Sequence, residues 1–520
     1  MARNICLHLA VAAAASLLFG GARLAPAEDA PRAVDQPPNI IFFMTDQQRG
    51  DTVPPAARAQ MPNVARFARD GVTFRQAFCP SPHCCPSRAT FFSGLYPSEH
   101  GVWNNVDVGN TLSRGPFPGT RLFSEDLRDA GYDLHFSGKW HVSATQGPDA
   151  FGWDMGWPAP HTMTAVTDAP DTHEWPPYEH HAADPTTRGP GEILRPGYGT
   201  YTHYGAVDDI WEHDRRTVDD ALRVISGRPR HGRRPWCQYV GTIGPHDPYL
   251  VPREYLDRYR LDDIRLPASF ADAMSDKPAL YRRTRRRFDQ LEETEQREAL
   301  RHYLAHCSVQ DDLFGRVLAA LDERGELDDT LVVFLSDHGD YAGDHGLWCK
   351  GLPCFRGAYH VPAIVRWPRG MRAAGRVVNA FVSLADFAPT FLEAAGLDAD
   401  RPMSGHSLLP WVRGETPDPW RDAVFTQTNG NELYGIQRSV STRDWKYVYN
   451  GFDEDELYDL RRDPDEVINL AADPAHADVV RRLCARLWRF AHEHRDVCIN
   501  PYVMVALAPW GPASYAWGES

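Results

Sequence analysis

Two uninterrupted apolar runs, each ending abruptly in polar residues, constrain the fold of this chain most. The run at 39–44 (NIIFFM) leads into Asp46, and the run at 331–335 (LVVFL) leads into Asp337. Apolar runs without alternating polar residues are typical of strands buried on both faces, as in a parallel sheet covered by helices. The carboxyl ends of such strands share one edge of the sheet, where α/β proteins bind their ligands. We therefore expect both acids at one site.

The rest of the chain alternates strand-like and helix-like segments until about residue 415. We expect strands over 132–140, 236–246 and 360–368, and helices over 61–70, 121–130, 291–324 and 381–396. The Pro-, Gly- and His-rich region 145–215 lacks periodicity and predicts long loops. After 415, short β-favouring pieces and a helical stretch at 472–495 predict a small α+β unit with a short antiparallel sheet. The fold class is therefore α/β, with a large, mostly parallel mixed sheet between helices.

The beginning of the chain has the order of a secretory signal. Arg3 precedes an apolar stretch, and Ala25-Pro26-Ala27 provides small residues for cleavage, which predicts a signal peptide over 1–27. We expect an exported protein, periplasmic or extracellular, with no transmembrane span in the mature chain. The formal charge of −15 argues against nucleic acid as a partner, because nucleic-acid binding needs a basic face.

Polar side chains of two chemical kinds follow the predicted strands. Oxygen and imidazole donors that suit a divalent cation are Asp46, Gln47, Asp337 and His338. Groups that supply positive charge or transfer protons are Arg88, Lys139, His141, His246 and Lys350. Taken singly, each has a plainer interpretation, because acids at strand ends cap turns and lysines are usually solvated. Their joint occurrence predicts an anionic substrate whose leaving oxygen needs a proton.

Three cysteines lie close together at 79–85. They are compatible with a disulfide beside a free thiol, or with half of a zinc site. However, the segment Cys84-Cys85-Pro86-Ser87-Arg88, followed by Ser93-Gly94 and Tyr96-Pro97, resembles the signature C-x-P-S-R of the formylglycine-dependent (type I) sulfatase family, within the alkaline phosphatase-like superfamily. Pro86 and Arg88 have the spacing of that signature from Cys84 and not from Cys85.

The resemblance spans about residues 38 to 475 and contains many motifs in order. They are Thr45-Asp46-Gln47-Gln48, Gly138-Lys139-Trp140-His141, Gly244-Pro245-His246-Asp247-Pro248-Tyr249, Ser336-Asp337-His338-Gly339-Asp340, Lys350-Gly351, Asp386 with Pro389-Thr390, Ser407-Leu408-Leu409-Pro410, Asp444-Trp445-Lys446-Tyr447 and Glu456-Leu457-Tyr458-Asp459-Leu460. The boundaries that it implies are a catalytic domain over 38–412, a C-terminal subdomain over 413–500 and a tail over 501–520.

The resemblance also implies a role for each matched residue. Cys84 is expected to be converted to formylglycine by a formylglycine-generating enzyme and to supply the nucleophile as its hydrate. Arg88 and Lys139 are expected to polarise the hydrate, and His141 to act as the base that releases sulfate. His246 and Lys350 are expected to bind the sulfate and protonate the alcohol. The expected cation ligands are Asp46, Gln47, Asp337, His338 and residue 84.

Two positions depart from the animal-type pattern, which has Asp at 47 and Asn at 338. Gln47 and His338 resemble a bacterial branch that includes polysaccharide sulfatases, choline-sulfatase-like enzymes and phosphonate monoester hydrolases. The family favours Ca²⁺, and the imidazole of His338 makes Mn²⁺ an alternative. Asn105 and Arg356 are candidate substrate-binding residues.

The resemblance implies a sulfuric ester hydrolase, and export and long loops favour a sulfated carbohydrate as its substrate. Two alternatives stay open: a phosphonate monoester or phosphodiester hydrolase of the same superfamily, and a non-catalytic surface binding protein that retains the fold.

Overall fold

The structure, a computed structural model, describes residues 37–108, 111–158, 188–195, 199–229, 234–398, 401–431, 433–498 and 508–513. The predicted signal peptide and most of the predicted tail lie outside the described residues.

A large mixed sheet forms the centre of the described part of the chain. In spatial order its strands are β12 (Arg376–Ser383), β2 (Val72–Phe78), β11 (Ala363–Arg366), β10 (Thr330–Ser336), β1 (Asn39–Thr45), β8 (Trp236–Gly241), β3 (Asp133–Gly138) and β4 (Asp154–Pro158). Only β11 runs antiparallel to its neighbours among these strands. The predicted mostly parallel sheet is therefore confirmed, and β1 and β10, the two apolar runs, pair directly with each other.

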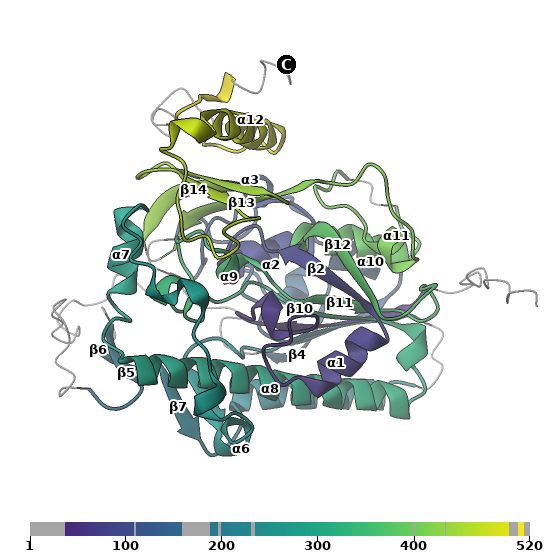
Figure 1. The fold of residues 1–520 in the computed structure, drawn as a ribbon. Helices are drawn as coiled ribbons and strands as arrows, with labels where there is room; N and C mark the ends of the chain where they lie inside the picture. Colours follow the sequence, from purple (N-terminus) through teal and green to yellow (C-terminus); the bar gives the residue numbers. More distant parts are fainter. Residues whose placement is uncertain are drawn as a thin grey trace, which may run out of the picture.

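Helices cover both faces of this sheet, which explains why its central strands are apolar throughout. Ile41 and Phe43 of β1 face one core, whereas Ile40, Phe42 and Met44 face the other. The first face is covered by α1 (Pro62–Arg69), α5 (Glu212–Gly227) and α8 (Glu293–Glu323), and the second by α2 (Cys84–Ser93), α4 (Phe123–Asp129) and α10 (Phe387–Ala394). Figure 1 shows α1 and α8 below the sheet and α2 and α10 above it.

A smaller antiparallel sheet lies above the second face. Its strands are β13 (Ala423–Gly430), β14 (Tyr434–Thr442), β15 (Trp445–Asn450) and β16 (Glu456–Asp459). Val448 and Tyr458 point into the core of the main sheet, whereas Tyr447 and Leu457 pack against helix α12 (Ala477–Glu493). The small sheet is therefore held between the large domain and α12, as Figure 1 shows. This arrangement confirms the predicted C-terminal α+β unit.

The remaining elements are short connections and pairings. They are the strands β5 (Glu192–Arg195), β6 (Gly199–Thr202), β7 (Tyr204–Val207) and β9 (Tyr249–Pro252), and the helices α3 (Pro97–His100), α6 (Arg253–Leu256), α7 (Ala279–Arg285), α9 (Arg356–Tyr359) and α11 (Leu409–Val412). No helix in the described ranges is both long enough and apolar enough to cross a bilayer.

Three details differ from the sequence-based expectations. The described parts of 145–215 contain β4, β5, β6, β7 and the start of α5, so this region is not only loops. The predicted helix over 381–396 is shorter, because its first three residues complete strand β12. Strand β2 was not predicted, because Arg75 and Gln76 interrupt its apolar pattern where the strand is only partly covered.

The aromatic contacts of α8 lead to a prediction about stability. Phe314 is fully buried and contacts Phe43, Phe67 and Phe334. We expect Phe314→Ala to lower the free energy of unfolding by about 3–5 kcal/mol, because it removes buried apolar surface and leaves a cavity. The control is Val377→Ala at a position that is 48% exposed, for which we expect a change within about 0.5 kcal/mol. Urea unfolding followed by circular dichroism measures both, and equal changes would contradict the packing role of Phe314.

Candidate active site

The site begins at the first turn of α2, which lies next to the carboxyl ends of β1, β3 and β10. All ten residues of α2 are buried, and Cys84 is its first residue. The Sγ atom of Cys84 lies 3.2 Å from Nε2 of His338 and 3.6 Å from Nζ of Lys139. It also lies 3.8 Å from Oδ1 of Asp46. Cys84 is thus surrounded by residues that follow three different strands.

Arg88, one helical turn after Cys84, connects these strand ends. Its guanidinium is fully buried and contacts Asp337 at 2.8 Å through Nε and Asp46 at 3.1 Å through Nη2. Nη1 donates to the carbonyl oxygen of Lys139 at 2.9 Å and to the hydroxyl of Tyr239 at 2.6 Å. Because an unpaired buried charge is very costly, the two acids and Arg88 depend on each other.

Four side chains present potential metal ligands to a single point. The donor atoms of Asp46, Cys84, Asp337 and His338 all lie within 4.8 Å of one another, and all four residues are buried. Nδ1 of His338 lies 2.9 Å from the carbonyl oxygen of Gly339, so Nε2 is left to face the carboxylates. This is the way in which proteins orient a histidine that binds a metal.

The electrostatics of the cluster also fit a cation. Burial and Cys84 raise the pKa of Asp46, but Lys139, His246 and Arg88 outweigh them and hold it below the ordinary value. The pKa of Asp337 is instead raised, by burial and by the charge on Asp46. Two carboxylates this close are difficult to ionise together without a further positive charge. The residues present therefore suit a divalent cation.

The same electrostatics distinguish the two neighbouring cysteines. Burial opposes ionisation of Cys84, yet Lys139, Lys350 and His338 lower its pKa well below the ordinary value. The pKa of Cys85 is raised, chiefly by burial. Sγ of Cys85 accepts a hydrogen bond from the backbone N–H of Val106 at 3.4 Å. Cys84 therefore faces the cluster of Asp46, Lys139 and His338, whereas Cys85 lies beside Asp107, His141 and the loop that carries Val106.

The remaining predicted residues form two groups beside Cys84. Nζ of Lys139 lies 2.6 Å from Asp46, and Nε2 of His141 lies 2.9 Å from Asp107. In the second group, Nζ of Lys350 lies 2.5 Å from Nε2 of His246 and 2.6 Å from Oε1 of Gln47.

Gln47 is held by neighbouring acids. Its amide nitrogen donates to Asp340 at 2.6 Å and to Asp247 at 3.2 Å. The hydroxyl of Tyr249 donates to the same oxygen of Asp340, also at 2.6 Å. Gln47 has φ of 64°, a left-handed conformation that is uncommon for residues other than glycine and often marks functional sites.

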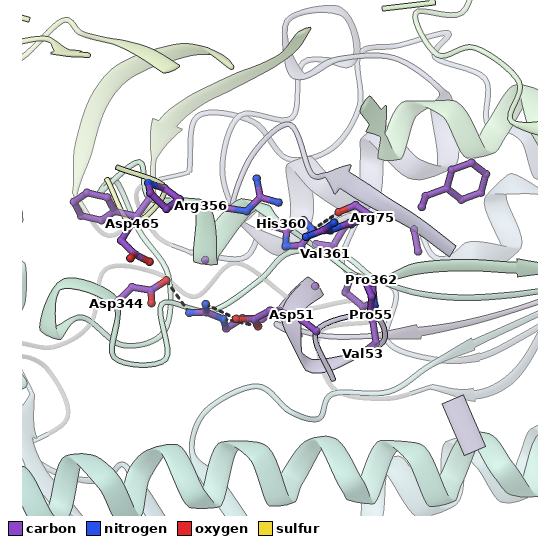
Figure 2. A pocket seen from close by; sticks show the side chains of 18 of the residues that line it. Asp51, Val53, Pro55, Arg75, Asp344, Arg356, His360, Val361, Pro362 and Asp465 are labelled. Carbon is purple, nitrogen blue, oxygen red and sulfur yellow. Dashed lines mark hydrogen bonds and ion pairs between the residues drawn. The ribbon is translucent and has the colours of Figure 1, made fainter. Parts of the chain in front are cut away.

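The two candidate substrate-binding residues lie in different places. Asn105 is next to the cluster, because its Oδ1 accepts from the backbone N–H of Cys85 at 3.2 Å. Arg356 is not brought to the cluster: among the described residues, its side chain contacts Gln76 and the ring of Phe78. Figure 2 shows Arg356 in a separate pocket with Asp51, Arg75 and His360.

Sequence reasoning did not assign roles to three residues that hold the site together. Tyr239 supports Arg88, Asp340 supports Gln47 and Asp107 supports His141. Asp340 was visible within the motif Ser336-Asp337-His338-Gly339-Asp340. Tyr239 lies inside an apolar strand and Asp107 in a loop, so only the three-dimensional structure connects them to the site.

Comparisons with known proteins identify the family of this chain. The Sulfatase family profile matches residues 38–397, and the profile described as N-sulphoglucosamine sulphohydrolase, C-terminal, matches residues 343–493. A choline-sulfatase from Rhizobium meliloti (strain 1021) is 30% identical over 461 residues, which cover 84% of this chain and 83% of that protein. An N-acetylglucosamine-6-O-sulfatase from Bacteroides thetaiotaomicron is 27% identical, covering 88% of this chain and 87% of its own length.

A solved structure is similar across nearly the whole fold. The phosphonate monoester hydrolase of Agrobacterium radiobacter has a TM-score of 0.70 and 25% sequence identity, covering 88% of this chain and 96% of that one. The family profile confirms the resemblance of the sequence motifs. The chain therefore belongs to the sulfatase family, a family of sulfuric ester hydrolases.

Proposed function

We propose that this protein is an exported sulfatase that hydrolyses a sulfate ester of a carbohydrate, with a formylglycine formed from Cys84 and a bound divalent cation. The single observation that carries the proposal is the position of Cys84. Its Sγ atom lies within 4 Å of Asp46, Lys139 and His338, in a buried cluster that also contains Arg88.

In this proposal, Sγ of Cys84 marks where the oxygens of the modified residue would lie. A formylglycine hydrate supplies a nucleophilic oxygen and a second hydroxyl, whose deprotonation expels sulfate and restores the aldehyde. Arg88 and Lys139 would orient residue 84, and their ion pairs with Asp46 support this role. A formylglycine-generating enzyme would be the partner in maturation.

The proton transfers are assigned to two separate groups beside residue 84. His246 and Lys350 are in contact with each other and would bind the sulfate oxygens and give a proton to the departing alcohol. His141, on the side of Asp107, would accept the proton of the second hydroxyl. Separate acids and bases suit a reaction in which one proton is given early and another is removed later.

A divalent cation would be held by Asp46, Asp337, His338, residue 84 and Gln47. When bound, it would neutralise charge on the sulfate group and lower the pKa of a coordinated hydroxyl. The carboxylates and the amide oxygen suit Ca²⁺, and the imidazole of His338 suits Mn²⁺.

A phosphonate monoester or phosphodiester hydrolase is the second candidate. The likeness to the Agrobacterium enzyme favours it, and Gln47 and His338 resemble the branch of the family that includes such hydrolases. The carbohydrate substrate is favoured by the Bacteroides relative, whose name gives N-acetylglucosamine 6-O-sulfate as its target. A non-catalytic binding role fits less well, because the full set of charged residues is assembled around Cys84.

The proposed organisation of the chain follows from the same likeness. We propose a catalytic domain over 38–412, a C-terminal subdomain over 413–500 and removal of residues 1–27 on export. The order of charge, apolar stretch and small residues near the amino terminus supports the last point.

The assignment of Cys84 can be tested against its neighbour. We expect Cys84→Ala to lower turnover of an aryl sulfate by at least about 10³-fold, because no other group supplies the nucleophile. Cys85→Ser keeps an acceptor for Val106 and should retain most of the activity. Mass spectrometry of the peptide 76–88 should show an aldehyde at 84 in protein from the native host. An unmodified thiol, or the opposite pattern of variants, would refute the assignment.

The reaction class can be tested with two chromogenic esters. We expect kcat/KM for 4-nitrophenyl sulfate to exceed that for bis(4-nitrophenyl) phosphate by at least about tenfold, a difference of about 1.4 kcal/mol in transition-state stabilisation. A clear preference for the diester would establish the second candidate instead. A panel of defined sulfated mono- and oligosaccharides then identifies the sugar and the position of the sulfate.

The ion preference can be tested at His338. Dialysis against a chelator should abolish activity, and Ca²⁺ or Mn²⁺ should restore it. Because imidazole favours transition metals, we expect His338→Asn to weaken binding of Mn²⁺ relative to Ca²⁺ by about tenfold in calorimetric titrations. An unchanged ratio of the two dissociation constants would exclude His338 as a ligand.

A further inference from the structure

We propose that Asp107 is the positioning residue that fixes the ring orientation and tautomer of His141. The inference rests on the proposed function, in which His141 is the base that triggers release of sulfate. Asp107 lies outside the motifs that resemble the family.

The contact itself is short and shielded from water. Nε2 of His141 lies 2.9 Å from Oδ1 of Asp107, and the two side chains are only 4% and 10% exposed. The donor atoms of Cys85, Asp107 and His141 lie within 4.8 Å of one another, directly beside residue 84. In such a site a carboxylate–imidazole hydrogen bond is stronger than at an exposed position.

The backbone at His141 explains why the ring needs support. His141 comes three residues after the end of β3 and has φ of 54°, in the left-handed region that residues other than glycine rarely adopt. It therefore lies beyond the hydrogen-bond ladder of the sheet. A side chain on such a strained turn keeps one orientation only if its surroundings fix it.

The loop that carries Asp107 is attached to the first turn of α2. The backbone N–H of Cys85 donates to Oδ1 of Asn105 at 3.2 Å, and the N–H of Val106 donates to Sγ of Cys85 at 3.4 Å. On its other side, the N–H of Asn105 donates to Oδ1 of Asn431, between β13 and β14, at 3.0 Å. Residue 84 and Asp107 are thus positioned by the same helical turn.

The choice of ring nitrogen follows from the partner. An ionised carboxylate only accepts hydrogen bonds, so Asp107 requires a proton on Nε2 of His141. The neutral ring then keeps its lone pair on Nδ1, which is the nitrogen left to accept a proton. When it does so, the carboxylate stabilises the imidazolium, as the acid of a serine-protease triad does for its histidine.

The other two histidines of the site are held in the opposite way. Nδ1 of His246 lies 2.6 Å from the carbonyl oxygen of Asp247, and Nδ1 of His338 lies 2.9 Å from that of Gly339. Both present Nε2 to the cluster, and both use a neutral backbone oxygen as their principal support. The carboxylate of Asp107 lies 2.9 Å from Nε2 of His141, whereas that of Asp46 lies farther from Nε2 of His338, at 3.5 Å. The shorter contact fits a group that gains a proton during the reaction.

The kinetic test compares two variants that separate charge from shape. Asp107→Asn keeps the shape but can donate to Nε2 and so favours the wrong tautomer. We expect it to lower kcat by about 10²–10⁴-fold while KM changes less than about threefold. Asp107→Glu keeps the carboxylate but not the shape, and should retain at least about ten times the kcat of the Asn variant. The control is Asp272→Asn, which removes a carboxylate 2.8 Å from His345, outside the cluster, and should leave kcat within about threefold of the wild-type value.

A spectroscopic readout is independent of both substrate and formylglycine. In ¹⁵N-histidine spectra, with His141 assigned from the His141→Gln variant, the wild-type ring should show the Nε2–H tautomer and Asp107→Asn should not. The inference is overturned if Asp107→Asn retains the wild-type kcat, or if its kcat exceeds that of Asp107→Glu. It is also overturned if the His141 ring has the same tautomer in Asp107→Asn as in the wild type. If wild-type enzyme with verified formylglycine hydrolyses neither sulfate esters nor diesters, the proposed function fails, and the tautomer spectra alone decide the role of Asp107.

Discussion

The buried guanidinium of Arg88 is the interaction on which the rest of the site depends. It joins helix α2 to the ends of β1 and β10 through Asp46 and Asp337, and to β3 and β8 through Lys139 and Tyr239. All of its polar partners are protein groups, so the cost of burying a charge is offset only while all of these strands are in place. Arg88 thereby fixes the strand ends relative to α2. It also fixes the position of residue 84, which lies one helical turn earlier in the same helix.

The central strands could be predicted from the sequence because burial on both faces leaves a simple signal. The runs at 39–44 and 331–335 became β1 and β10, and 291–324 became α8, with bounds that differ by one or two residues. Strand β2 and most of β12 were missed, because partial exposure interrupts their apolar pattern. The order of the strands, in which β11 separates β2 from β10, follows from long-range packing that no local pattern records.

In the site, too, some residues could be predicted from the sequence and others could not. The candidate catalytic and metal-binding residues could be proposed because each lies in a motif that resembles the family, and several of these motifs directly follow a strand. The supporting residues Tyr239 and Asp107 could not be predicted. Their roles depend on contacts with Arg88 and His141, which lie in other parts of the chain. Arg356 shows the reverse case, since its proximity in sequence to Lys350 does not bring it to the cluster.

The charge of the site explains why sulfate esters and phosphodiesters are both reasonable substrates for such a fold. A sulfate monoester, a phosphodiester and a phosphonate monoester are all tetrahedral and carry one negative charge near neutral pH. Arg88, Lys139 and Lys350 attract all three equally, so net charge cannot discriminate among them. They differ at one corner, which is a terminal oxygen in the sulfate ester, an ester oxygen with an organic group in the phosphodiester and a carbon in the phosphonate monoester. Selection must therefore come from the groups that meet this corner: a hydrogen-bond donor there favours sulfate, because an organic substituent would leave that donor unpaired.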